Sequence, residues 1–144
     1  MATLSKIIFT DGKELAMQRL FDNSYTEAET FPYLALGYSN GGGFVDSQDT
    51  PDNGFIEIDE STYERIELHY KDTEKDDSTG KVTVTFSAEL DYNNIRETRP
   101  INQIAVVNSG IAHDGQTKFY SATTFPTFQK HAQNAMTFVI GFRF

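Results

Sequence analysis

Apolar and polar side chains alternate along much of the chain after residue 31. The alternation is strictest over residues 82–92, and it recurs over residues 65–70 and 136–144. A period of two is typical of a β-strand with one buried face, because successive side chains point to opposite sides of the strand. We therefore predict three strands whose inward-facing side chains are Ile66, Leu68 and Tyr70, then Val82, Val84, Phe86, Ala88, Leu90 and Tyr92, and finally Met136, Phe138, Ile140, Phe142 and Phe144.

Further segments rich in β-branched, leucine and aromatic residues also predict strands. Residues 101–107 carry apolar side chains at positions of both parities, which is typical of a central strand that is buried on both faces. Pro126 is predicted to end the last of these strands, because proline has no backbone N–H to donate. The predicted segments are 4–10 (a short strand or an extended arm), 33–37, 55–58, 101–107 and 119–125.

One short helix is predicted near the start of the chain. Asp11 can cap its free N–H groups, and Glu14 completes the capping-box pattern three residues later. The apolar stripe that follows consists of Ala16, Met17, Leu20 and Phe21, and residues 22–24 end the helix.

Turn-forming residues separate the predicted strands. Residues 40–43 and 46–54 are rich in Gly, Asn, Asp and Pro, and Asp114-Gly115 is a hairpin signal. Residues 71–80 are predicted to form a solvated hairpin tip, since they carry no apolar side chain. Seven or eight strands at spacings near ten residues indicate an all-β fold, an antiparallel β-sandwich, with a small closed barrel as the second choice.

The predicted elements divide the chain into two parts. Residues 1–30 are predicted to form an amino-terminal arm with the short helix, and residues 31–144 the β-sandwich domain. A chain of 144 residues is long enough to bury a core of its own without staples.

Composition narrows the classes of function. The chain has no cysteine, which excludes disulfides, thiolate metal sites and a cysteine nucleophile. Residues 1–100 hold 20 acidic and 9 basic side chains (−11), and residues 101–144 hold 1 and 3 (+2), which gives the net charge of −9. An acidic body repels phosphate backbones, so nucleic acid is not expected as a partner. No signal peptide or membrane-spanning run is evident, so no membrane association is expected.

Candidate catalytic and metal-binding residues are few. His69, His113 and His131 are interpreted as surface side chains, because none has a second ligand at metal-binding spacing. No serine lies in a nucleophile-elbow motif, and Gly41-Gly42-Gly43 lacks the Lys-Ser/Thr of a phosphate loop. Neither an enzyme activity nor a cofactor is therefore expected.

Two acidic segments are candidate cation sites. Asp46, Asp49 and Asp52 recur at every third position, but the pattern of a calcium loop is missing. The second segment carries Asp72, Glu74, Asp76 and Asp77, and its acids are interleaved with lysines. A solvated loop and a charged hairpin tip are the favoured interpretations, and no metal is expected.

Paired carboxylates and tyrosines offer two further alternatives. A glycosidase-like pair could come from Glu57, Asp59, Glu60, Glu64, Glu67 and Glu89, although the sequence does not place any two of them together. A sugar-binding face could come from Tyr25, Tyr33, Tyr38, Tyr63, Tyr70, Tyr92 and Tyr120. Packing in the core or at its margins is the favoured interpretation for these tyrosines.

The order of segments from about residue 33 to the end resembles a β-sandwich domain of tailed-phage virion proteins, found in tail-fibre and baseplate attachment modules. The resemblance is carried by Leu34-Ala35-Leu36-Gly37 before a Gly-rich loop, by residues 62–66 and 82–90, and by residues 119–130 and 136–140. Ile101-Asn102-Gln103-Ile104-Ala105-Val106-Val107 is similar to the family's Ile-Asn-Glu-Ile-Gly-Leu stretch, from which it departs at Gln103 and Ala105. The acidic segment 71–80 is longer than in the family, and residues 1–30 lie outside the resemblance.

The resemblance implies a non-enzymatic virion subunit, assembled in the host cytoplasm and present in several copies. Its partners would be other virion proteins, met through strand edges, loops and terminal arms. A tail, baseplate or fibre-connecting subunit is the first hypothesis. A capsid decoration or head-fibre protein is the second, and a carbohydrate- or receptor-binding module is the third. The family implies no catalytic, cofactor-binding or metal-binding residues.

Overall fold

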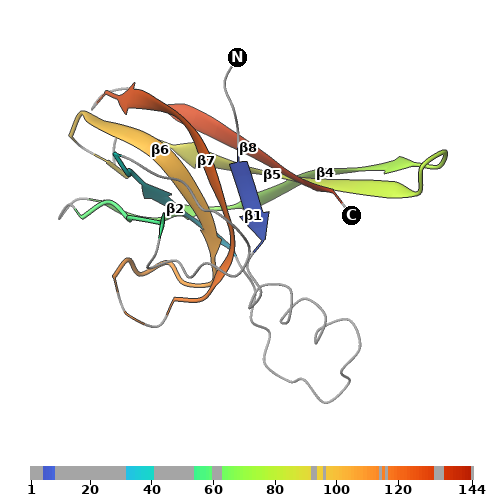
Figure 1. Cartoon of the computed structure of the whole chain (residues 1–144), viewed down its shortest axis with the longest axis horizontal. Coiled ribbons are helices and arrows are strands. Elements are labelled where there is room, and N and C mark those ends of the chain that lie inside the picture. The colour runs from blue at the N-terminus through green and yellow to red at the C-terminus, as the bar shows by residue number, and fades with distance from the viewer. Residues whose placement is uncertain are drawn as a thin grey trace.

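The chain folds into two antiparallel β-sheets (Figure 1). The computed structural model describes residues 5–8, 32–40, 54–59, 63–91, 94–95, 97–113, 115, 117–131 and 135–143. One sheet has five strands in the order β1-β7-β6-β2-β3, and the other has three in the order β4-β5-β8. An all-β fold is therefore confirmed.

The five-stranded sheet collects strands from both ends of the described chain. Its central strand is β6, which pairs with β2 on one side and with β7 on the other. The prediction of a central strand over residues 101–107 is confirmed. The strands are β1 (Ser5–Ile8), β2 (Tyr33–Gly37), β3 (Ile66–Glu67), β6 (Arg99–Val107) and β7 (Phe119–Lys130).

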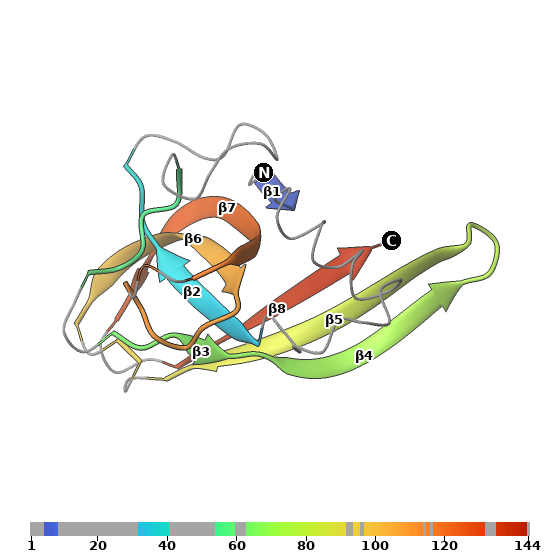
Figure 2. The ribbon, with the colours of Figure 1, turned by 90° about the horizontal axis from the view of Figure 1, so that it is seen from below.

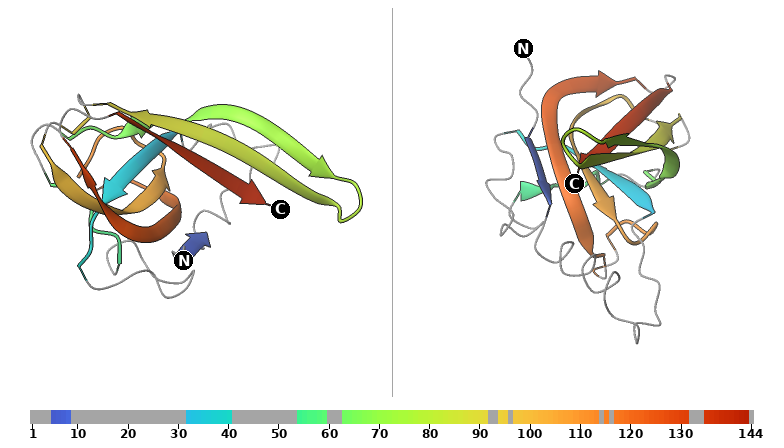
Figure 3. Two further views of the ribbon diagram at one scale, coloured as in Figure 1. Left: turned by 90° about the horizontal axis from the view of Figure 1, so that it is seen from above. Right: turned by 90° about the vertical axis from the view of Figure 1, so that its right-hand side faces the viewer.

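The three-stranded sheet consists of a long hairpin and the last strand. Strands β4 (His69–Asp76) and β5 (Lys81–Leu90) form the hairpin, and β8 (Met136–Arg143) pairs with β5. The tip of the hairpin extends well beyond the body of the molecule (Figures 2 and 3). Strand β8 starts at the base of the hairpin, where Met136 pairs with Leu90, and runs outward until Arg143 pairs with Thr83. We call the β4–β5 hairpin, residues 69–90, the arm.

One apolar core lies between the two sheets. From the five-stranded sheet it receives Leu34 and Leu36 of β2 and Ile101, Ile104 and Val106 of β6. From the three-stranded sheet it receives Ala88, Leu90, Ile140 and Phe142. The inward faces predicted for residues 82–92 and 136–144 are confirmed for these described residues, because Thr137, Val139, Gly141 and Arg143 are exposed.

The opposite face of the five-stranded sheet is also covered. A second apolar cluster there contains Ala35, Ala105, Val107 and Ala122, with Phe55 packed over them. The ring of Phe55 meets that of Phe119 edge-on, with centroids 5.7 Å apart. The small side chains of the strands leave room for these two rings.

Two predicted strand boundaries are wrong. Strand β7 continues through Pro126 to Lys130, because the register shifts between Ile101 opposite Phe128 and Gln103 opposite Thr124. Three residues of β7 thus face one residue of β6, so Pro126 lies in an irregular stretch where its missing N–H costs the ladder little. The second error concerns residues 71–76, which extend β4 by pairing with β5, so that the turn shrinks to residues 77–80.

Two further predictions need correction. Residues 55–58 form a single bridge, Gly37 to Glu57, instead of a strand. Arg65, assigned to the polar face, is buried, whereas Tyr70, assigned to the buried face, is 63 % exposed. The predicted helix at residues 11–21 and the loops at 41–43 and 46–52 lie outside the described residues. In the part of the chain that is described, no helix has the length and apolar character needed to span a membrane.

Candidate functional site

A buried ion pair ties the segment before β3 to the segment that bridges β2. Nε and Nη2 of Arg65 donate to the two carboxylate oxygens of Glu57, each at 2.8 Å. The two side chains are 2 % and 8 % exposed. This paired geometry matches the planar fork of the guanidinium to the carboxylate, so the contact fixes orientation as well as charge.

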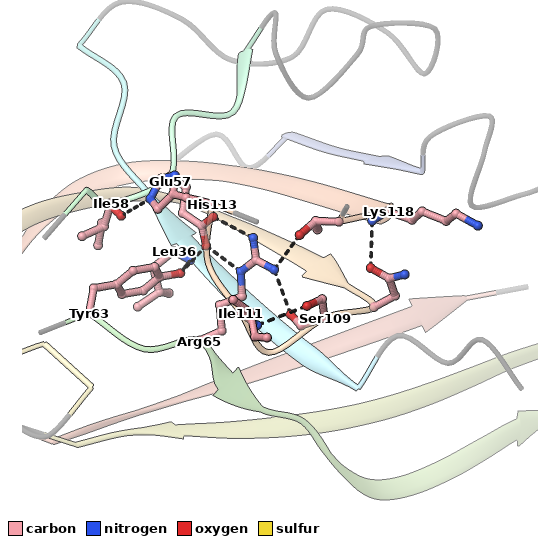
Figure 4. A network of polar contacts seen from close by, with 11 residues as sticks. Leu36, Glu57, Ile58, Tyr63, Arg65, Ser109, Ile111, His113 and Lys118 are labelled. Carbon is pink, nitrogen blue, oxygen red and sulfur yellow. Dashed lines mark hydrogen bonds and ion pairs between the residues drawn. The ribbon is translucent and has the colours of Figure 1, made fainter. Parts of the chain in front are cut away.

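Arg65 also binds the loop between β6 and β7. Its Nη1 donates to the Ser109 carbonyl and to the Thr117 hydroxyl, each at 2.8 Å (Figure 4). One guanidinium therefore joins three segments that are far apart in the sequence. Removal of either charged partner would leave the other buried and unpaired.

Tyr63 completes the environment of Glu57. Its hydroxyl donates to a carboxylate oxygen of Glu57 at 2.7 Å and accepts the Leu36 N–H at 2.9 Å. Burial raises the pKa of Tyr63 far above its ordinary value of 10.0, and the neighbouring negative charge of Glu57 raises it further. Both effects favour the protonated hydroxyl, which is the form that donates to Glu57.

His113 holds the tip of the same loop. Its Nε2 lies 2.8 Å from the Ile58 carbonyl, so Nε2 carries the proton of this contact. The residue has a φ of 59°, in the left-handed region that non-glycine residues seldom occupy. The contact with Ile58 thus fixes a strained turn against residues 54–59.

The polar network around Glu57 holds loop segments in place. The Glu57 carboxylate accepts three hydrogen bonds, from Tyr63 and twice from Arg65. Both oxygens of the carboxylate are thus engaged by neighbours within the protein. The sequence offered Glu57 as one member of a glycosidase-like pair of carboxylates. In the structure its charged partner is the guanidinium of Arg65.

A second polar clamp lies on β6. Gln103 is fully buried, and its amide accepts the Ile56 N–H at 3.0 Å and donates to the Gly54 carbonyl. The approach of this segment to β2 is so close that a Cβ on Gly37 would lie 2.6 Å from the Ile56 carbonyl oxygen. Gln103 and Gly37 together determine how residues 54–58 cover the sheet.

Asn102 performs a similar task for the segment after β2. Its amide accepts the Ser39 N–H at 2.9 Å and donates to the Ser39 carbonyl at 2.7 Å. The side chain thereby replaces a neighbouring strand for one residue. Asn102 and Gln103 are the two polar positions within the otherwise apolar residues 101–107 of β6, and each binds a different loop backbone.

The other candidate residues are dispersed over the surface. The three histidines are all exposed, as are Asp59, Glu64, Glu67 and Glu89. Among the described residues, no group of three or more His, Asp or Glu side chains is placed to hold a metal ion. Candidates outside the described residues are Asp46, Asp49, Asp52, Glu60, Tyr25 and Tyr92.

The described tyrosines do not gather on one face. Tyr63 is buried, and Tyr33 and Tyr120 pack against the two apolar clusters. Tyr70 is exposed on the arm, where its ring meets that of Phe86 edge-on. Packing at the core is thus confirmed for Tyr33, Tyr63 and Tyr120.

The outer arm, residues 72–85, presents two different faces. Residues directly opposite in an antiparallel pair share a face, so Thr73 and Lys75 lie with Val84 and Val82. Asp72, Glu74 and Asp76 lie on the other face with threonines and a lysine of β5: Thr85, Thr83 and Lys81. All eight residues of β4 are exposed.

The turn of the arm is held by its own hydrogen bonds. Asp76 accepts the backbone N–H and the hydroxyl of Ser78, at 3.0 and 2.7 Å. Hydrogen bonds from Ser78 and then Thr79 lower the pKa of Asp76 below its ordinary value of 3.8. The N–H of Gly80 donates to the Asp76 carbonyl, and Gly80 has a φ of 72°. The tip is therefore an ordered turn.

Sequence reasoning missed the buried polar residues Arg65, Gln103 and Lys130. Lys130 is 1 % exposed, and its Nζ donates to the His131 carbonyl at 2.6 Å. Desolvation lowers the pKa of Lys130, and the negative charge of Asp91 acts in the opposite direction. The burial of Gln103 could have been predicted, because it is a polar residue inside an apolar segment. No comparable sequence pattern indicates that Arg65 or Lys130 is buried.

Comparison of the chain with protein-family models, with curated proteins and with solved structures finds no match.

Proposed function

We propose that the chain is a non-enzymatic structural subunit of a bacteriophage virion, belonging to a tail, a baseplate or a fibre connection. It assembles with other virion proteins through strand edges, loops and arms. The fold is proposed to be an antiparallel β-sandwich, with residues 11–21 as one short helix. Two sheets that share one core support the sandwich, and the resemblance of the segment order supports the virion role.

The observation that carries the proposal is the arm. All of β4 is exposed, and the outer arm stands away from the body (Figure 3). Strand β8 supports β5 from Thr83 to Leu90, so only the outermost part of the arm is two-stranded. A two-stranded hairpin by itself is only marginally stable. A long ordered arm that covers so little of its own protein fits a docking element whose surface is buried in an assembly.

The polar network gives a second, weaker support. Glu57, Tyr63 and Arg65 direct their polar groups at one another and at loop backbones. Such a network fixes residues 54–59 against Ser109 and Thr117 beside the sheet. Rigid loops on a sheet scaffold suit recognition of a protein surface.

The test is whether the chain is present in particles. Phage particles purified by density gradient from a culture that produces the chain are analysed by quantitative mass spectrometry, and tails are separated from heads. The proposal predicts a fixed, multiple copy number in the tail fraction. Absence from particles refutes it, and recovery with heads alone identifies the decoration-protein hypothesis instead.

Two arm variants test the mechanism of assembly. In the first, residues 74–83 are replaced by Asn-Gly, which joins Thr73 to Val84, two residues that are paired in the arm. In the second, Val82→Thr with Val84→Thr keeps the arm's length and strand propensity. Both variant proteins are expected to fold, with an unchanged circular-dichroism spectrum. The protein with the shortened arm is expected to be absent from particles. Incorporation of the trimmed protein at the wild-type copy number would refute the role of the arm.

A further inference from the structure

The two edge strands of the three-stranded sheet differ in their content of charged residues. Both β4 and β8 are edge strands of the three-stranded sheet. Five of the eight β4 residues are charged, namely Lys71, Asp72, Glu74, Lys75 and Asp76, whereas β8 carries one charge, Arg143. The register with β5 also shifts between Tyr70 and Asp72. Charges and a bulge on an edge are devices that protect a sheet against indiscriminate strand pairing, so a partner of β4 must compensate these charges.

The charge pattern of β4 disfavours pairing with a second copy of itself. When two identical strands pair about a two-fold axis, opposite residues must lie on the same face, so their numbers have the same parity. Each such register of the outer strand sets acid against acid: Asp72 against itself, Asp72 against Glu74, Glu74 against itself, or Glu74 against Asp76. Like charges directly opposite destabilise a strand pair.

A partner strand with the opposite pattern of charges would form favourable pairs along the same edge of β4. Basic residues opposite Asp72 and Glu74 would form cross-strand ion pairs on one face. An acidic residue opposite Lys75 would form a third pair on the other face. The backbone of an edge strand offers its outward N–H and C=O groups to such a partner, which is the usual mode of strand addition.

We propose that the outer edge of β4 accepts, by antiparallel strand addition, a strand of another protein that carries Lys or Arg at alternate positions. This inference deepens the proposed function, on which it rests for the biological identity of the partner as a virion protein. The chemistry of the edge is independent of that identity. The ion pairs select the partner, and the backbone hydrogen bonds hold it.

Synthetic peptides test the inference on the full-length protein. The matching peptide is Thr-Lys-Glu-Lys-Val-Lys-Thr, whose central residues face Asp76, Lys75, Glu74, Thr73 and Asp72 in that order. Two-dimensional amide NMR is expected to show saturable shifts at residues 69–76, and titration gives the Kd. The charge-swapped peptide, with Glu for Lys and Lys for Glu, is expected to bind at least ten-fold more weakly.

Backbone methylation separates strand addition from plain attraction between charges. The matching peptide is also made with N-methyl groups at alternate residues, in both alternations, so that one version lacks the donors facing β4. That version is expected to lose at least ten-fold in affinity while its charges are unchanged. Equal binding of both N-methylated versions and the parent peptide would overturn strand addition.

Substitutions in β4 provide the matched controls. Asp72→Lys with Glu74→Lys is expected to weaken the matching peptide at least ten-fold and to favour the charge-swapped one. Thr73→Ser, an exposed change on the other face, is expected to leave both affinities within two-fold. The inference would be overturned if the Asp72 and Glu74 substitutions left the affinity for the matching peptide unchanged. It would also be overturned if the parent chain formed concentration-dependent dimers that these substitutions abolished. Binding of the peptide by a chain that is absent from particles would remove the proposed function and leave the edge chemistry intact.

Discussion

At the scale of single residues, two glycines in strands differ in the space beside them. A Cβ on Gly37 would lie 2.6 Å from the Ile56 carbonyl oxygen and 3.0 Å from the Phe55 ring. A Cβ on Gly141 would meet its nearest atom, in Thr83, at 3.5 Å, which is ordinary contact. Gly37→Ala is therefore expected to lower the free energy of unfolding by about 1–3 kcal/mol. Gly141→Ala is expected to change it by less than about 1 kcal/mol. Urea unfolding of the two variants checks the difference, and equal losses would contradict it.

Tyr63 gives the protein a pH dependence of known sign. The unfolded chain loses this proton near its ordinary pKa of 10.0, whereas burial raises the native pKa far above that. Above pH 10 the native state therefore binds more protons than the unfolded state, and the free energy of unfolding falls as the pH rises. One proton corresponds to about 1.4 kcal/mol per pH unit. Tyr63→Phe is expected to remove this slope.

The same variant has a cost at neutral pH. It leaves the Leu36 N–H and one Glu57 hydrogen bond without their partner, which is expected to cost about 1–3 kcal/mol. Urea unfolding between pH 7 and 11 measures both effects, with Tyr70→Phe, a change to an exposed hydroxyl, as the control. Burial also raises the pKa of Tyr120, which contributes equally to all three proteins. A slope unchanged in Tyr63→Phe would show that Tyr63 is ionised in the native state.

Residues such as Arg65 mark the limit of prediction from the sequence. Its neighbours in the alternating pattern placed it on the solvent side. Its hydrogen-bond partners come from positions 8, 44 and 52 residues away. A local pattern records which side of a strand a residue takes, and it does not record which distant loop covers that side.

At the scale of elements, the strands were predictable where one face is buried. The alternation of residues 86–90 and 136–143 follows from one apolar face on the shared core, whereas Val82 and Val84 belong to neither apolar cluster. The extension of β4 over residues 71–76 was not predictable, because these side chains face solvent on both sides of the strand and carry no apolar pattern. Their strand conformation comes from pairing with β5, which is a property of the partner strand.

The turn of the arm yields a prediction at this scale. Gly80 has a φ of 72° and no atom within 4 Å of where a Cβ would lie, so its backbone conformation, and not space, limits substitution. Gly80→Ala is expected to destabilise the turn by roughly 1–2 kcal/mol, and Gly80→Asn by less, because Asn tolerates the left-handed region. Hydrogen exchange of residues 70–86 is expected to speed up about ten-fold in the alanine variant only.

The destabilisation caused by Gly80→Ala is expected to stay within the arm. The outer arm contributes no residue to either apolar cluster, so the urea midpoint of both Gly80 variants is expected to stay near that of the parent chain. Faster exchange throughout β6 and β7 in the alanine variant would contradict a separable arm.

At the scale of the whole molecule, charge is distributed unevenly along the chain. Residues 1–100 carry −11 and residues 101–144 carry +2, so the net charge of −9 comes from the part that includes the arm. A basic partner is attracted over a distance of many ångströms before any strand pairs. Salt screens this attraction, since the Debye length is about 10 Å at 0.1 M and about 3 Å at 1 M.

Long-range attraction and edge pairing affect different rates. Attraction by the whole chain accelerates encounter, whereas backbone hydrogen bonds at β4 determine how long the complex lasts. Raising the ionic strength from about 0.02 M to about 0.5 M is therefore expected to slow association of the matching peptide about ten-fold. Its dissociation is expected to change by less than about three-fold. Stopped-flow mixing with a fluorescent peptide measures both rates. If salt acted mainly on dissociation, the exposed ion pairs at Asp72 and Glu74 would hold the complex by themselves, and the edge of β4 would be a charged surface and not a site for an added strand.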